Sequence, residues 1–323
     1  MSIISNCTAT AIKDAAATLI KGHLVAFPTE TVYGLGADAT NEDAIARIYK
    51  VKGRPVGHPL IVHISSLGNL DKWARDIPEY ALTLARVFWP GPITLILPRT
   101  DLAKDFITGG QDNVGVRIPS HSVALALLKE FEVQGGLGIA APSANRFGAI
   151  SPTSAQAVED ELGSYLKIRD LILDAGSCSI GIESTIVNCT QDAPSILRPG
   201  AITHEMINST LYGVGQPLEI NNNRSNVRVS GSMKSHYAPK AKVIISSSPS
   251  EGDGFIALAK FSTPKGVIRL ASPINDIEFA KILYAAFRLA DTKGLKRVFV
   301  IPPLGNGLAA AINDRLVKSA TQS

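Results

Sequence analysis

The chain has 323 residues, of which 45% are hydrophobic and 19% charged, a composition that argues against extended disorder. Its 27 glycines and 19 prolines follow no repeat, which excludes a collagen-like chain, and its three cysteines lie too far apart for a metal motif or a disulfide framework. The net charge of +4 is too weak for a nucleic-acid coat protein, and without a basic leader or a long apolar run we expect a cytoplasmic protein with no membrane segment.

The apolar spacing over roughly the first 205 residues predicts helices alternating with strands. We expect helices near 9–21, 40–51, 78–88, 120–131 and 153–162, and strands near 24–27, 60–64, 93–98, 114–118, 137–141, 170–174 and 184–188. Thr40 followed by Asp43 resembles a capping box that opens the second of these helices. Several strands follow one another too closely for helical crossovers, so the predicted fold is an α/β domain with a mixed sheet.

Residues 212–240 have a different character, because they are rich in Gly, Asn and Ser and lack helical periodicity. A stretch this long without secondary structure is usually a linker or a functional segment. After it, apolar strands and two helices, near 275–291 and at the end of the chain, predict a second, smaller α/β unit. We therefore divide the chain into a catalytic domain (1–211), a linker or lid (212–240) and a small C-terminal domain (241–323).

Positive charge is concentrated in two stretches without acids, residues 44–70 and 220–250. Such a field attracts phosphates, although a solvated basic face is the ordinary alternative. In the first stretch Lys50, Lys52 and Arg54 stand at a predicted helix end, where the helix dipole also favours cations. Three cations within five residues, with no acid beside them, are better explained by a bound anion, which Arg can hold through two parallel hydrogen bonds.

Hydroxyl groups follow the first predicted strand, in the segment PTETVYGLG (28–36). In an extended conformation Thr29, Thr31 and Tyr33 share one face and Glu30 takes the other. Hydroxyls beside a glycine turn suit a small polar ligand, although threonines also simply fill strand ends.

Two further polar groups follow predicted strands. In APSAN (141–145), Ser143 and Asn145 stand at a carboxyl end, the usual ligand position in open α/β sheets, or else cap a turn. GIESTIV (181–187) and LRPG (197–200) add Ser184, Thr185 and Arg198. Arg117 lies within an apolar strand and needs a ligand or a partner, for which Glu183 is the candidate. His63, in LIVHI, is by itself more often a core histidine than a catalyst.

Several common catalytic signatures are missing from the sequence. It contains no Walker A pattern, no G-x-G-x-x-G after a strand, and no H-E-x-x-H, G-x-S-x-G or C-x-x-C. The sequence therefore gives no support for a serine hydrolase or a zinc enzyme.

Taken together, PTETVYGLG, KGRP followed by PLIVHI, APSAN, GIESTIV and LRPG resemble the threonylcarbamoyl-adenylate synthase family, the YrdC-like enzymes of tRNA modification. The similarity runs over about residues 10–205, and the trailing domain resembles the long, two-domain form of the family. The resemblance implies a twisted mixed-sheet α/β domain with a concave basic surface. It also implies a reaction in which L-threonine, bicarbonate or CO2 and ATP give threonylcarbamoyl-adenylate and pyrophosphate.

The resemblance assigns roles to individual residues. It implies catalytic cations at Lys50, Lys52 and Arg54. L-threonine contacts are implied for Thr31, His63, Arg117, Ala141 and Ser184. Nucleotide contacts are implied for Lys52, Arg54, His58, Thr108, Ser143, Asn145, Arg198 and Tyr237. Tyr237 would come from the linker as part of a lid, although SGSMKSHYAP (230–239) departs from the usual Pro-Gly-Met-(basic)-Tyr-x-His-Tyr pattern.

The implied reaction needs no protein nucleophile, because a carbamate made from threonine attacks the α-phosphate of ATP. It needs cations that align two anions, with Mg²⁺ on the triphosphate and no metal held by the protein. A separate transferase would pass the product to tRNA, with weak direct tRNA binding as an option. An RNA-binding module ranks second, because aromatic residues are scarce and none cluster with the basic stretch. A carbamoyl-group enzyme with another acceptor is the third reading.

Overall fold

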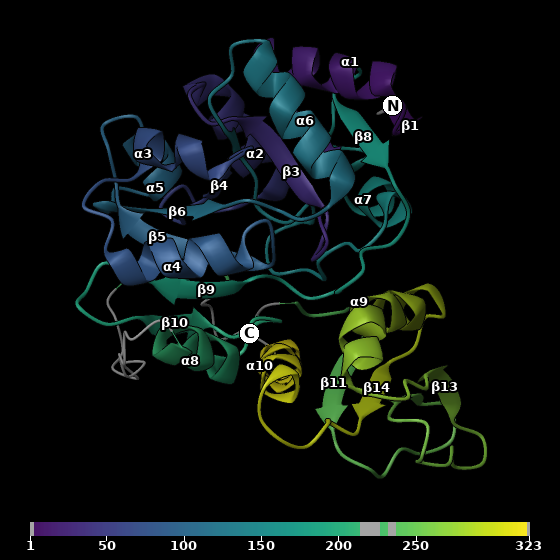
Figure 1. The fold of residues 1–323 in the computed structure, drawn as a ribbon. Coiled ribbons are helices and arrows are strands. Elements are labelled where there is room, and N and C mark those ends of the chain that lie inside the picture. Colours follow the sequence, from purple (N-terminus) through teal and green to yellow (C-terminus); the bar gives the residue numbers. More distant parts are fainter. Residues whose placement is uncertain (1–2, 214–226, 232–236, 322–323) are drawn as a thin grey trace.

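The computed structural model of the chain describes residues 3–213, 227–231 and 237–321. Two sheets organise it (Figure 1): one has the strand order β1-β8-β2-β3-β7-β4-β6-β5-β9-β10, the other β11-β14-β12-β13. The large sheet mixes parallel pairs, such as β4 with β6, and antiparallel pairs, such as β5 with β6, so the predicted mixed sheet is confirmed. The strands of the small sheet are all parallel.

The elements of the first domain alternate as the sequence predicts. Its strands are β1 (Ile3–Asn6), β2 (Val25–Phe27), β3 (Gly34–Asp38), β4 (Ile61–His63), β5 (Ile93–Pro98), β6 (Asn113–Arg117), β7 (Ile139–Ala140), β8 (Leu171–Asp174), β9 (Thr185–Asn188) and β10 (Ser195–Arg198). Its helices are α1 (Ala9–Ile20), α2 (Glu42–Lys52), α3 (Leu70–Trp73), preceded by a 3-10 turn (Leu67–Asn69), α4 (Glu79–Phe88), α5 (Asp105–Thr108), α6 (Ser122–Val133), α7 (Ala155–Leu162) and α8 (His204–Gly213).

The second domain contains β11 (Lys242–Ile245), β12 (Gly254–Ile256), β13 (Ile268–Ala271), α9 (Asp276–Thr292), β14 (Arg297–Val300) and α10 (Leu308–Ala320). The described part of helix α8 extends to Gly213, one residue beyond the predicted start of the linker at 212. Much of that linker lies outside the described residues.

The start of α2 corrects one prediction. Asn41, not Thr40, caps this helix, because its side chain accepts a hydrogen bond from the Ala44 amide. Thr40 is held one residue earlier, where its amide and hydroxyl both donate to Asp38 at the end of β3. The capping box was therefore wrong by one residue, since the carboxylate of Asp38 takes the hydroxyl that would have capped the helix.

Side chains of the large sheet point alternately to its two faces, as strand geometry requires. On β2, Val25 and Phe27 pack with α1 and α6, whereas Ala26 belongs to the core on the opposite face. Over the β4-β6-β5-β9 part, the face that carries Ile61 is covered by residues 227–231, whose Val227 and Val229 pack on it. This part of the sheet, under the described piece of the linker, is where a ligand site can form.

The two domains share an apolar core. Ile150 and Ile182 of the first domain belong to the same buried cluster as Phe279 and Leu283 of α9 and Ile312 of α10. At Gly181, which has a positive φ of 85°, an added Cβ would lie 2.5 Å from the Cα of Lys281 on α9, so no larger residue fits. Close packing of this kind makes the second domain a fixed neighbour of the first. No helix within the described ranges is long and apolar enough to cross a membrane.

Candidate active site

A pocket opens on the face of the large sheet that residues 227–231 cover. About 560 Å³ in and around it is free of protein atoms, a volume that includes open solvent at its mouth. The sequence-predicted residues that line it are Thr31, Arg54, His63, Arg117, Ala141, Ser143, Ser184, Arg198 and Tyr237. Thr29, one of the hydroxyl residues expected to suit a polar ligand, lines it as well. No ligand role was predicted for the other lining residues, which are Val32, Gly34, Ile61, Pro142, Glu183, Ser230 and Gly231.

Strand register brings His63 and Arg117 together. They are paired in the parallel β4–β6 ladder, each as the last residue of its strand. The Arg117 guanidinium forms a buried 2.6 Å ion pair with Glu30 and donates to the Thr31 hydroxyl at 3.0 Å. The expected partner, Glu183, was wrong, because Glu30 lies in the turn that folds over the end of β6 while Glu183 pairs elsewhere.

The segment 28–33 is bent rather than extended, and β3 begins only at Gly34. The hydroxyls of Thr29 and Thr31 lie 2.8 Å apart at the pocket wall. Tyr33 is turned away and donates from its hydroxyl to the Gly176 carbonyl, so the predicted shared face of the three hydroxyls was wrong. A bend replaces the strict alternation that an extended strand would have imposed.

His63 is buried and holds no charge at neutral pH. Burial, followed by the nearby Arg117 guanidinium, lowers its pKa from 6.5 to about 3. A neutral imidazole can donate one hydrogen bond and accept another, so His63 can orient a polar ligand without adding charge.

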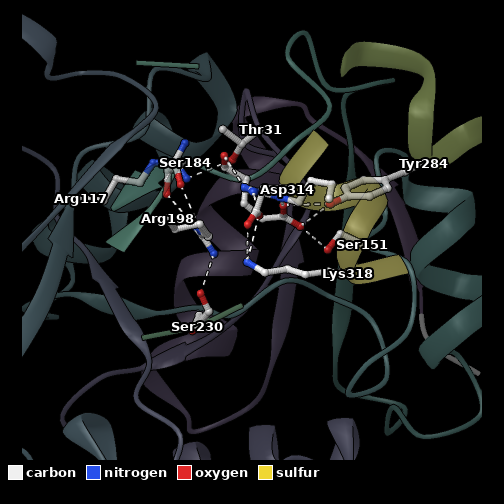
Figure 2. Close-up of polar contacts among 11 residues, drawn as sticks. Thr31, Arg117, Ser151, Ser184, Arg198, Ser230, Tyr284, Asp314 and Lys318 are labelled. Atoms are coloured by element: carbon white, nitrogen blue, oxygen red, sulfur yellow. Dashed lines mark hydrogen bonds and ion pairs between the residues drawn. The ribbon is translucent and has the colours of Figure 1, made fainter. Parts of the chain in front are cut away.

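Two other arginines supply the positive charge of the pocket. Arg54 donates to the Pro59 carbonyl and the Ser230 hydroxyl. Arg198 donates to Ser184 and to the Ser230 carbonyl (Figure 2). Neither forms an ion pair with any residue in the described ranges. Burial lowers the pKa of Arg54 to about 10, which still leaves the guanidinium charged at neutral pH. Two charged guanidinium groups in one pocket make a site for an anion.

Lys52 ties two motifs together instead of facing the pocket. Its ammonium is buried and donates to the carbonyls of Ser143 (2.6 Å) and Asn145 (2.5 Å). The loop of Ser143 also pairs with Gly34. Lys52 therefore positions Ser143 at the pocket wall, with Asn145 buried behind it. Burial, followed by Arg54, lowers the pKa of Lys52.

Besides Lys52 and Asn145, three predicted residues lie outside the pocket lining. Lys50 is exposed on α2, because it stands two residues from Lys52 and so points to the other side of the helix. The ring of His58 packs edge-on against Phe147, 5.2 Å away, outside the lining residues. Thr108 is buried at the end of α5, within 3.4 Å of Arg99.

The wall opposite Arg117 is built with help from the second domain. Tyr237 lines the pocket and its ring stacks on Tyr284 of α9, with centroids 5.7 Å apart. Glu183, on the same wall, pairs with Arg315 of α10 at 2.8 Å. Residues 232–236, with His236 and half of the predicted lid motif, lie outside the described residues. No motif in the sequence indicated that Arg315 would reach this site.

The described residues do not form a metal site of their own. They contain no group of three or more His, Cys, Asp or Glu side chains that could hold an ion. The carboxylate of Glu183 in the pocket already accepts hydrogen bonds from Ser151, Tyr284 and Arg315. The described side chains therefore do not fit a resident Mg²⁺, and an ion that accompanies a triphosphate would have phosphate oxygens and water as ligands.

Comparisons with known proteins agree with this geometry. A Sua5/YciO/YrdC family model, described as "Telomere recombination", matches residues 17–200. The model "Threonylcarbamoyl-AMP synthase, C-terminal domain" matches residues 202–321. The chain is 40% identical to the threonylcarbamoyl-AMP synthase of Pyrococcus abyssi, with 96% of this chain and 94% of that one covered. It is 34% identical to the Schizosaccharomyces pombe enzyme, with 99% and 91% covered.

A solved structure of the same kind is similar over both domains. The crystal structure of Pyrococcus abyssi Sua5 complexed with L-threonine superposes with a TM-score of 0.87 at 36% identity, covering 99% of this chain and 98% of that one. The resemblance read from the sequence motifs is therefore confirmed. The chain belongs to the Sua5/YrdC family of threonylcarbamoyl-AMP synthases, in its long, two-domain form.

Proposed function

We propose that this chain is an L-threonylcarbamoyladenylate synthase that acts in the formation of threonylcarbamoyladenosine beside the anticodon of tRNA. It uses L-threonine, bicarbonate or CO2, and ATP, and it releases pyrophosphate. Curated relatives at 34–44% identity carry the name threonylcarbamoyl-AMP synthase. The single observation that carries the proposal is that one pocket holds an ion-paired arginine beside hydroxyl groups and two arginines without a carboxylate partner among the described residues.

The reaction needs alignment more than a reactive side chain. Bicarbonate takes up a proton and loses water to give CO2, whose carbon bonds to the neutral threonine amine as that amine loses a proton to solvent. An oxygen of the resulting carbamate bonds to the α-phosphorus of ATP. The bond from that phosphorus to the bridging oxygen of the β-phosphate breaks, and pyrophosphate leaves with the electron pair. Both reactants are anions, so fixed cations lower the barrier by holding them together.

On the amino-acid side, Arg117 and Thr31 bind L-threonine, with His63, Ala141 and Ser184 completing the wall. A guanidinium suits the carboxylate of an amino acid, and the hydroxyl and imidazole groups suit its polar side chain. Support comes from the L-threonine complex of the Pyrococcus abyssi protein and from the 3.0 Å contact between Arg117 and Thr31.

On the nucleotide side, Arg54 and Arg198 bind the phosphates of ATP, assisted by Ser143 and Tyr237. Lys52 and Asn145 act behind them, because the Lys52 ammonium holds the loop that carries Ser143. Mg²⁺ enters with the triphosphate. Transfer of the product to a separate threonylcarbamoyl transferase, weak tRNA binding, a basic surface around the pocket and a cytoplasmic location stay predictions.

The proposal is tested by pyrophosphate release from the purified full chain. We expect release that requires L-threonine, bicarbonate and ATP together, with threonylcarbamoyl-adenylate as the product found by mass. Equal release with valine in place of threonine, or a product with a different acceptor, would overturn the assignment. ATP-independent tRNA binding with no pyrophosphate release would favour the RNA-binding alternative.

A further inference from the structure

A buried ionic cluster joins the two domains at the wall of the pocket (Figure 2). At its centre Glu183 accepts from Arg315 at 2.8 Å, from the Tyr284 hydroxyl at 3.0 Å and from the Ser151 hydroxyl at 2.5 Å. Arg315 also pairs with Asp314 at 2.6 Å. The side chain of Arg315 has no exposed surface, although it is charged and lies within a largely apolar interface.

Glu183 bonds to one cation, Arg315, and its chain neighbour Ser184 accepts hydrogen bonds from a second cation, Arg198. Burial alone would raise the pKa of Glu183, but Arg315 and then Arg198 lower it to about 2, so the carboxylate is ionised at neutral pH. Its ion pair is with Arg315. Arg198 is within electrostatic reach of Glu183 but gives its own hydrogen bonds to Ser184 and Ser230.

We propose that Arg315 is a positioning residue for ATP binding: by holding the Glu183 carboxylate, it keeps the charge of Arg198 available to phosphate. This inference rests on the proposed function, because it assumes that Arg198 binds the nucleotide. Arg315 belongs to α10, so the second domain determines the charge of a pocket that lies on the sheet of the first.

Packing behind the pocket supports this role. The Arg315 guanidinium lies 5.3 Å from the centre of the Tyr237 ring, whose other neighbour is Tyr284. The backbone of α9 leaves no room for a side chain at Gly181, two residues before Glu183. Two of the partners of Glu183, Tyr284 and Arg315, are thus held by the helices α9 and α10, and the carboxylate has little freedom to turn toward Arg198 while Arg315 is present.

Loss of Arg315 would leave Glu183 with Arg198 as the neighbouring cation. A buried carboxylate without its partner is strongly disfavoured, so it turns to the nearest remaining positive charge. That contact neutralises Arg198 and weakens its attraction for phosphate. The test is therefore whether removal of the Glu183 charge reverses the effect of removing Arg315.

The experiment compares Arg315→Met, Glu183→Gln and the double variant in the full-length chain, with ATP affinity measured by calorimetry and KM values by pyrophosphate release. We expect Arg315→Met to raise the ATP Kd about tenfold. The double variant should return to within about threefold of the wild type. The KM for threonine should change less than about twofold in both.

Arg297→Met is the matched control, because Arg297 also pairs with a carboxylate, Asp253, within the second domain but away from the pocket. It should leave the ATP Kd unchanged. If Arg315→Met does not fold, Glu183→Gln alone decides: the proposal requires ATP affinity no weaker than that of the wild type, and weaker binding would contradict it.

Folded Arg315→Met with normal ATP affinity, or a double variant as weak as Arg315→Met, would overturn the inference and leave Arg315 with a purely structural role. A wild-type chain that binds no ATP would instead overturn the proposed function.

Discussion

Both sides of the pocket contain arginine, but only on one side is the arginine paired with a carboxylate. On one side Arg117 is bonded to the carboxylate of Glu30, so the pair carries almost no net charge. On the other side Arg54 and Arg198 donate to hydroxyl and carbonyl oxygens, and their positive charges are not cancelled by a bonded carboxylate.

This difference matches the charges of the two proposed ligands. L-threonine is a zwitterion without net charge, and a neutral arginine–glutamate pair can orient its carboxylate without attracting other anions. A triphosphate carries several negative charges and gains most from guanidinium groups that no carboxylate has neutralised. The comparison indicates that the pairing of each arginine, rather than the number of arginines, separates the two binding sites.

The largest expected effect comes from removing an arginine of the unpaired side. Arg54→Ala should lower kcat/KM for ATP about 100-fold, because the phosphates lose a fixed cation in a desolvated site. Steady-state pyrophosphate release measures this loss, and thermal unfolding monitors the fold. Arg75→Ala is the control, since Arg75 is exposed and pairs with Asp76. Loss of folded protein in Arg54→Ala would point to a structural role instead.

Replacing the paired arginine should affect the other substrate. Arg117→Met should lower kcat/KM for threonine about 30-fold, which is roughly 2 kcal/mol of lost charge-assisted hydrogen bonding, while the KM for ATP stays within about twofold. The variant should also unfold at a lower temperature, because Glu30 is left buried without its partner. The double variant Arg117→Met/Glu30→Gln should regain stability but not threonine binding. Equal changes in the KM values for threonine and ATP would contradict the proposal that the two substrates bind on different sides of the pocket.

A smaller effect is expected where the linker meets the unpaired side. Gly231 has a φ of 80°, and an added Cβ would lie 2.3 Å from the Tyr237 hydroxyl and 3.4 Å from Arg198. Gly231→Ala should therefore displace Tyr237 and raise the KM for ATP about threefold to fivefold. Gly294→Ala is the control, because Gly294 has a φ of 64° and open space around it. Similar ATP KM values in both variants would show that the close contact between Gly231 and Tyr237 does not affect nucleotide binding.

The smallest effect concerns stability in acid. The pKa of Glu183 is about 2 in the folded chain, compared with its ordinary value of 4.5, so the unfolded chain binds a proton first. The contribution of Glu183 is therefore present above about pH 4.5 and is lost as the pH falls toward 2. Melting temperatures measured across this range should fall more steeply for the wild type than for Glu183→Gln. Parallel curves would show that the carboxylate is not held as the structure indicates.

The sequence by itself determined the elements and the family. Long periodic segments were predicted nearly to the residue, as for the helix expected at 9–21 and observed at Ala9–Ile20, because an amphipathic pattern depends on local spacing. The ordered motifs identified the family and many of the pocket residues, since each motif lies at a strand end that the fold brings to one face. Short elements such as β1 and β10 were not predicted, because four residues are too few to show a clear hydrophobic periodicity.

The tertiary structure alone decided which charges meet. The sequence offered Glu183 as the carboxylate partner of Arg117, and only the folded turn at 28–33 shows that Glu30 takes this place. The sequence predicted that Lys52 binds the ligand, but its ammonium donates hydrogen bonds to backbone carbonyls of another loop. Arg315 lies 132 residues from Glu183 and reaches it because α10 docks against the first domain. Local sequence patterns record which groups are present, but electrostatic pairing depends on distances that only the packed chain sets.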